Sequence, residues 1–153
     1  MDASLLDNRD IFIGKTFSSC HAFYDFITDH LLFEQKIKDG YKQSILHREE
    51  KFPTGLDTGL IKVAIPHTDY NQSNTTQLVI TTLSQPVKFR QMDKPSKEIA
   101  VSIILLILFD KPQKQLTLLQ QIMKIVQNQQ ILTEIMAQKT TNSMVRLFKK
   151  IGG

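Results

Sequence analysis

A nearly unbroken apolar run, EIAVSIILLILF at residues 98–109, constrains the fold more than any other stretch of the chain. Its apolar residues do not alternate with polar ones, which is typical of a strand covered on both faces of its sheet. From Ile99 to Phe109 the run spans only eleven residues, whereas a membrane-spanning helix needs about 20. We therefore expect a buried central strand with helices packed above and below the sheet.

The flanking segments supply the other elements of such a fold. Further strands are expected at 10–17, 60–65 and 76–83, the last followed by a turn at Gln85-Pro86. Apolar residues at helical spacing predict helices that begin after Ser18 or Ser19 and at 41–52, 112–126, 129–138 and 142–151. The predicted fold class is α/β: a three-layer sandwich with a central mixed β-sheet and helices on both faces, forming a single domain over residues 1–153.

Charge and cysteine content exclude several classes of function. The net charge is +4, but the densest basic groups, 36–38 and 146–150, have no row of stacking aromatic residues beside them. A solvated basic surface is therefore expected rather than a nucleic-acid site. Cys20 is the only cysteine, so no intramolecular disulfide and no thiolate metal site can form. Early acidic residues such as Asp2 and Asp7 do not fit a secretory signal. We expect a cytoplasmic protein that is not inserted in a membrane.

The sequence also lacks the common metal and cofactor motifs. It has no closely spaced pair of histidines or cysteines of the kind that zinc sites use. Neither a phosphate-binding G-x-x-x-x-G-K-[ST] loop nor a dinucleotide-binding G-x-G-x-x-G motif is present. A G-x-S-x-G motif for acyl transfer is also absent. We therefore expect neither a metal nor a cofactor.

The segment FPTGLDTGLIKVAIPHTD, residues 52–69, places a histidine directly after a strand. His67 follows Pro66, which stiffens the backbone, and functional sites gather at the carboxyl ends of strands in α/β sheets. Gly55 and Gly59 are interpreted as turn glycines. Composition alone favours a loop histidine in water. The alternative is a nucleophilic imidazole, as in phosphoryl transfer through histidine.

A longer segment, HREEKFPTGLDTGLIKVAIPHTD, resembles a known family. It is similar to the fructose/mannitol-type enzyme IIA domain (EIIA type 2) of the bacterial phosphoenolpyruvate-dependent sugar phosphotransferase system (PTS). That family carries an R-E-x-x-x-P-T-G segment, followed by a strand that ends in I-P-H. The matching residues are Arg48, Glu49, Pro53, Thr54, Gly55, Ile65, Pro66 and His67. The order of expected elements agrees over roughly residues 5–150.

The resemblance implies a phosphotransferase activity. His67 would accept a phosphoryl group from the phosphocarrier protein HPr and pass it to a cysteine of an enzyme IIB, which serves the membrane enzyme IIC in sugar uptake. Arg48 would stabilise the phosphoryl group, because a guanidinium fork can hold two of its oxygens. The alternative for Arg48 is an ion pair with Glu49 or Glu50. Thr54 would either donate its hydroxyl to the site or stabilise the turn.

The chain departs from the family pattern at one position. Many members carry a second histidine in an H-L-x-x-L segment, but here the segment reads QLTLL, with Gln115 at that place. Glutamine can donate a hydrogen bond but cannot titrate. The stretch KPQKQLTLL resembles the galactitol-specific branch, which indicates galactitol or a related polyol. His47 matches no family histidine, and its role is left open. An alternative function is that of a regulatory EIIA-like protein whose histidine phosphorylation controls binding to other proteins.

Overall fold

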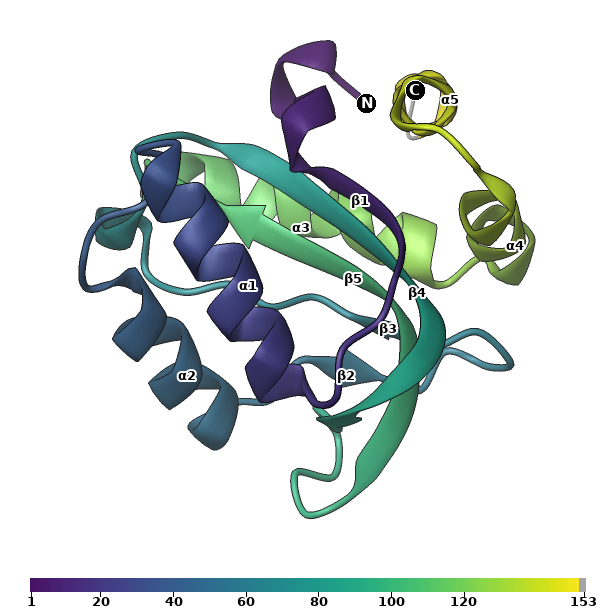
Figure 1. Ribbon diagram of the computed structural model, residues 1–153, viewed down its shortest axis with the longest axis horizontal. Helices are drawn as coiled ribbons and strands as arrows, with labels where there is room; N and C mark the ends of the chain where they lie inside the picture. The colour runs from purple at the N-terminus through teal and green to yellow at the C-terminus, as the bar shows by residue number, and fades with distance from the viewer. Residues whose placement is uncertain (152–153) are drawn as a thin grey trace.

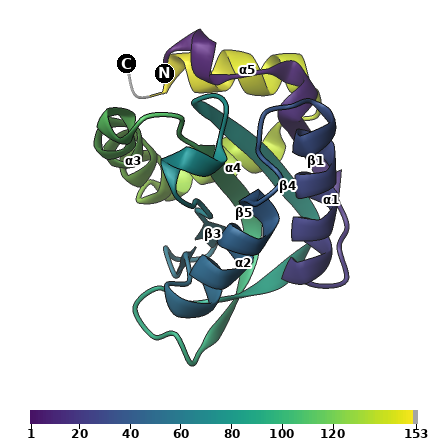
Figure 2. The same ribbon diagram turned by 90° about the vertical axis from the view of Figure 1, so that its left-hand side faces the viewer.

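The computed structural model describes residues 1–151 and contains the expected three layers within them. Figures 1 and 2 show a mixed sheet with α1 and α2 on one face and α3, α4 and α5 on the other. The strands are β1 (Ile11–Lys15), β2 (Gly55–Leu56), β3 (Val63–Ala64), β4 (Gln77–Arg90) and β5 (Glu98–Leu108), in the order β1-β4-β5-β3-β2. The helices are α1 (Cys20–Phe33), α2 (Tyr41–Lys51), α3 (Pro112–Val126), α4 (Gln129–Ala137) and α5 (Thr141–Lys150). The predicted fold class is confirmed.

Strand β5 is buried on both faces, as its composition predicts. Ile103, Leu105 and Ile107 pack into the core beneath α3, α4 and α5. The intervening residues Ile104 and Leu106 pack into a second core beneath α1 and α2. Each large aliphatic side chain that is fully buried contributes about 1.5–3 kcal/mol. The two cores therefore explain why this strand carries no polar alternation.

Strand β4 is longer than expected, and the turn predicted at Gln85-Pro86 is wrong. β4 continues to Arg90 and pairs antiparallel with β5 from Gln77 onward. Its pairing register shifts between Thr82 and Val87, and Ser84, Gln85 and Pro86 inside this irregularity are exposed. A proline cannot donate to a ladder, but it is tolerated at such a bulge. The tight β4–β5 hairpin therefore turns only in the polar loop 91–97.

The strand before His67 is short and is paired on both sides. β3 comprises only Val63 and Ala64, rather than the whole of 60–65, and it lies parallel to β5. Its other neighbour, β2, pairs antiparallel with it through Gly55 and Leu56. Gly55 is therefore a strand residue and not the turn glycine that was expected. Gly59, with φ of 128°, does take a conformation that favours glycine.

Gly55 is required by a close backbone approach. A Cβ atom at this position would lie 2.5 Å from the carbonyl oxygen of Arg90, at the end of β4. At the same place, the Met92 N–H donates a hydrogen bond to the Gly55 carbonyl at 2.8 Å. This contact joins the P-T-G segment to the β4–β5 hairpin.

None of the helices within residues 1–151 has both the length and the apolar composition that crossing a membrane requires.

We expect Gly55→Ala to destabilise the fold by about 1–3 kcal/mol, the usual cost of overpacking, because the new methyl group meets rigid backbone. The measurement is chemical denaturation monitored by circular dichroism. Gly40→Ala is the control, since a Cβ there meets only the flexible end of the Gln72 side chain, at 2.9 Å. Equal stability of Gly55→Ala and the unmodified protein would contradict the close-approach argument.

Candidate functional site

His67 lies at the carboxyl end of β3, at one end of the sheet, and its side chain is buried. The residue is only 8% exposed, so a loop histidine in water is excluded. Its ring meets the ring of Phe109, the residue that follows β5, edge to face with centroids 6.1 Å apart. The Pro66 carbonyl accepts a hydrogen bond from the Ile107 N–H at 3.0 Å, which ties the loop to β5. The parallel strands β3 and β5 thus jointly determine the position of His67.

The backbone determines which ring nitrogen of His67 is free. Nδ1 lies 2.8 Å from the carbonyl oxygen of Ile65. Because a carbonyl can only accept, Nδ1 carries the proton in the neutral ring and Nε2 keeps its lone pair. Burial lowers the pKa of His67 below 6.5; the Ile65 carbonyl opposes this shift, and the nearby charge of Arg48 adds to it. The imidazole is therefore neutral and nucleophilic near neutral pH.

Two of the other residues predicted for the site share a cavity with His67. The cavity has a volume of about 300 Å³, and its lining residues are Arg48, Lys51, Phe52, Pro53, Thr54, His67, Met92 and Pro95. Gln115 lies in the first turn of α3 and is not among them. His47 lines an adjacent hollow of about 230 Å³, which also includes Arg48 and Thr68. The structure thus brings Arg48 and Thr54 to His67, but not Gln115.

The guanidinium of Arg48 has donors available for an anion. Within residues 1–151 no ion pair joins Arg48 to Glu49 or Glu50, the alternative that its position in the helix allowed. Its Nε is buried and has no hydrogen-bond partner in that part of the chain. The guanidinium carbon lies 5.8 Å from the centre of the Phe52 ring. A buried donor without a partner is costly, and a bound oxyanion would satisfy it.

Thr54 directs its hydroxyl at Glu49 rather than at the cavity. Its Oγ1 donates to Glu49 Oε1 at 2.6 Å, and its backbone N–H donates to Oε2 at 3.3 Å. Of the two roles that the sequence left open for Thr54, this geometry favours stabilising the turn. Glu49 therefore links the end of α2 to the P-T-G segment. The sequence suggested Glu49 only as an alternative ion-pair partner of Arg48, and its contact with Thr54 was not predicted.

The β4–β5 hairpin forms the opposite wall of the cavity. Met92 and Pro95 line it from the hairpin loop. Arg90 anchors this loop, because its Nε donates to the Pro95 carbonyl at 2.7 Å and its Nη1 donates to the Glu50 carbonyl at 3.0 Å. The hairpin is thus attached to the end of the helix that carries Arg48.

Comparison with known proteins gives one family. The family described as "Phosphoenolpyruvate-dependent sugar phosphotransferase system, EIIA 2" matches residues 4–151. A curated relative, the PTS system galactitol-specific EIIA component of Escherichia coli (strain K12), is 29% identical over 93 residues. That alignment covers 61% of this chain and 61% of the relative, less than two thirds of its length.

Solved structures share the fold over nearly the whole chain. A putative PTS IIA domain from Streptococcus pyogenes M1 GAS has a TM-score of 0.76 at 20% identity, covering 98% of this chain and 97% of its own. Enzyme IIAMTL of Escherichia coli, in its complex with phosphorylated enzyme IIBMTL, has a TM-score of 0.75 at 16% identity. That match covers 94% of this chain and 96% of the other. At these identities the likeness concerns the fold alone.

Glu49 should make stability depend on pH. Burial raises the pKa of Glu49 from 4.5 to about 7, against the opposing effect of Thr54. The folded state therefore binds a proton more tightly than the unfolded chain. This contribution is fully present below 4.5 and is lost as the pH rises through about 7, and it amounts to about 3 kcal/mol.

Glu49→Gln should remove this dependence. We expect the difference in free energy of unfolding between variant and unmodified protein to change by about 3 kcal/mol between about pH 4.5 and pH 7.5. Urea denaturation at several pH values measures it, and the titration of His67 cancels in the difference. Glu50→Gln, which removes the same charge from an exposed neighbour, is the control. Parallel pH profiles for Glu49→Gln and the unmodified protein would contradict the expectation.

Proposed function

Because the chain belongs to the EIIA 2 family of the phosphoenolpyruvate-dependent sugar phosphotransferase system, we propose that it is a phosphoryl carrier that uses His67. His67 accepts the group from phosphorylated HPr and passes it to a cysteine of an enzyme IIB. The observation that carries this proposal is the free Nε2 of a buried, neutral imidazole that shares a cavity with Arg48. The relatives' name supports galactitol or a related polyol as the transported compound.

The proposed transfer needs only groups that surround the cavity. The Nε2 lone pair attacks phosphorus, an N–P bond forms, and the bond between phosphorus and the donor breaks with its electron pair going to the donor. Nδ1 keeps its proton, so the phosphorylated ring becomes cationic and remains a good leaving group. The Ile65 carbonyl, 2.8 Å from Nδ1, stabilises this cation. A cysteine thiolate of the acceptor then attacks phosphorus, and the ring leaves as neutral imidazole.

Arg48 is proposed to stabilise the charge on the transferring group. Phosphoryl transfer spreads negative charge over the equatorial oxygens, and catalysis consists mostly of positioning and electrostatics. Arg48 lines the cavity, and its buried Nε has no hydrogen-bond partner within residues 1–151. Thr54 supports the site by holding the P-T-G segment against Glu49. A hydrogen-bonding role for Gln115 stays a prediction.

The rim of the cavity suits protein partners. Phe52 is 65% exposed and Met92 is 40% exposed, and both line the cavity that contains His67. Exposed apolar side chains beside a reactive group are typical of an interaction surface. The solved complex of enzyme IIAMTL with phosphorylated enzyme IIBMTL has the same fold and supports enzyme IIB as a partner. HPr, and indirectly the membrane enzyme IIC, complete the proposed set.

Intact-mass measurement tests the carrier residue. The protein is incubated with phosphoenolpyruvate, enzyme I and HPr, and we expect the mass of one acid-labile phosphoryl group on the unmodified protein. His67→Ala should gain none while keeping its circular dichroism spectrum. His47→Ala, which removes the exposed histidine of the adjacent hollow, should gain the full amount. Phosphorylation of folded His67→Ala would overturn the proposal.

The acceptor separates transport from regulation. Addition of a cognate enzyme IIB should move the phosphoryl group onto its cysteine. A stable phospho-His67 that is not transferred, but changes binding to another protein, would favour the regulatory alternative.

Arg48→Lys should slow phosphoryl acceptance without unfolding the protein. Lysine keeps the charge but loses the fork, and one hydrogen bond to a charged group is worth about 1.5–3 kcal/mol. We therefore expect acceptance to be about 10–100-fold slower in rapid-quench measurements. Arg146→Lys, at an exposed position of α5, is the matched control. An unchanged rate in Arg48→Lys would exclude the proposed role.

A further inference from the structure

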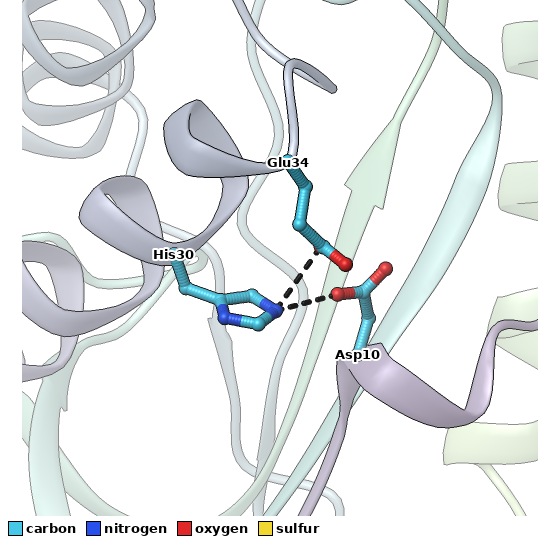
Figure 3. Close-up of side chains that lie close together, drawn as sticks. All are labelled: Asp10, His30 and Glu34. Carbon is cyan, nitrogen blue, oxygen red and sulfur yellow. Dashed lines mark hydrogen bonds and ion pairs between the residues drawn. The ribbon is translucent and has the colours of Figure 1, made fainter.

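A second group of polar side chains lies away from the cavity of His67. Asp10, in the turn before β1, meets His30 and Glu34 at the end of α1 (Figure 3). The Nε2 atom of His30 lies 2.8 Å from Asp10 Oδ1 and 3.1 Å from Glu34 Oε1. All three ligand-type atoms lie within 4.8 Å of one another. We call these three residues the Asp10–His30–Glu34 cluster.

Neighbouring residues orient both carboxylates toward His30. Asp10 Oδ2 accepts from Gln77 Nε2 at 2.6 Å and from the Lys36 ammonium, which leaves Oδ1 facing the imidazole. Glu34 Oε2 faces Arg9 Nε at 3.5 Å, which leaves Oε1 facing His30 Nε2. One nitrogen and two oxygens thus converge on one point, each carboxylate being held by its other oxygen.

Glu34 is buried without a donor for the converging oxygen. Its side chain is only 7% exposed, and within residues 1–151 Oε1 has no hydrogen-bond partner. A proton on His30 Nε2 can be donated along the shorter contact to Asp10, which leaves Oε1 without one. A buried carboxylate oxygen in this position is costly unless a cation meets it.

The net charge of the surrounding side chains also favours binding of a further cation. Three carboxylates, of Asp7, Asp10 and Glu34, face two cations, Lys36 and Arg9. These five side chains together carry one net negative charge. Both cations contact the outer carboxylate oxygens most closely; Lys36 Nζ approaches Glu34 Oε1 only to 3.8 Å.

We propose that Asp10, His30 and Glu34 form a zinc-binding site. An imidazole nitrogen with two carboxylate oxygens is a ligand set that zinc accepts, whereas calcium and magnesium prefer oxygen ligands alone. Three protein ligands leave a fourth position for water, and His30, whose side chain is 28% exposed, gives solvent access. Gln77 supplies an outer contact of the kind that usually orients a metal ligand, and it holds Asp10 Oδ2 independently of Lys36.

The distances need only a small adjustment. Around a tetrahedral ion with bonds of about 2.0–2.1 Å, neighbouring ligand atoms lie about 3.3 Å apart. The observed separations of 2.8 and 3.1 Å would open by a few tenths of an ångström. Asp10 lies in the turn before β1 and Glu34 lies at the end of α1, so the ion would join these two segments. The sequence gives no sign of this site, because zinc motifs are recognised by closely spaced histidines or cysteines and Asp10 lies far from His30 and Glu34 in sequence.

The site is independent of the proposed phosphoryl chemistry. It lies at the same end of the sheet as His67, because Gln77 begins β4 opposite Leu108 at the end of β5. The strand order places β4 and β5 between β1 and β3, however. Three strand spacings of about 4.8 Å separate the two sites. Zinc binding can therefore be tested whether or not His67 carries a phosphoryl group.

Calorimetric titration of the full chain, freed of metal by a chelator, with zinc chloride tests the proposal. We expect one saturable zinc per chain and a Tm that rises with zinc. His30→Ala and the nearly isosteric Glu34→Gln should weaken binding at least about tenfold, the lower range of effects reported for outer contacts alone. His21→Ala is the matched control: His21 lies on the same helix, 3.6 Å from Asp25, but both side chains are exposed. It should bind as the unmodified protein does.

Lys36→Met separates a metal site from a purely structural ion pair. Removing this ammonium makes the cluster more negative, so zinc should bind more tightly even though the metal-free protein loses stability. Absence of saturable zinc binding in the unmodified protein overturns the proposal. Equal affinity in folded Glu34→Gln also overturns it, as does a loss in His21→Ala that matches the loss in His30→Ala.

Discussion

The burial of β5 on both faces is the constraint from which the rest of the structure follows. One set of its side chains packs beneath α3, α4 and α5, and the alternate set packs beneath α1 and α2. Such a strand cannot lie at an edge, so β4 and β3 flank it on either side. Its carboxyl end then determines where Phe109 meets His67. The imidazole of His67 is therefore positioned by contact with the end of the buried central strand.

The orientation of His67 is a local property, whereas its electrostatic setting is not. The carbonyl that selects the tautomer belongs to Ile65, two residues earlier, so the strand end and the proline suffice to aim Nε2. Arg48 reaches the same cavity from the end of α2. Glu49, its neighbour, holds Thr54 and thereby fixes the segment between them. A short stretch of sequence thus builds most of the site.

Sequence reasoning succeeded where the determinants were local. The buried strand, the helix boundaries and the P-T-G and I-P-H motifs could all be recognised from spacing and composition. The turn expected at Gln85-Pro86 was wrong because long-range pairing with β5 overrides the local turn preference. The need for glycine at Gly55 depends on the approach of Arg90 from a distant strand. Burial of His67 likewise requires tertiary contacts, because its ring packs against Phe109 at the end of a distant strand.

The anchored hairpin has a consequence for how such a site diversifies. His67 and Arg48 come from one continuous segment, but the facing wall of the cavity comes from loop 91–97, which Arg90 ties to the Glu50 carbonyl. The two walls are separate in sequence, so loop residues that make no contact with the other wall can change without altering it. The facing wall of the cavity can therefore change through substitutions in the loop, while the imidazole and its hydrogen bond to the Ile65 carbonyl remain as they are. The shape of the cavity is thus open to change at one wall without displacement of His67 and Arg48 at the other.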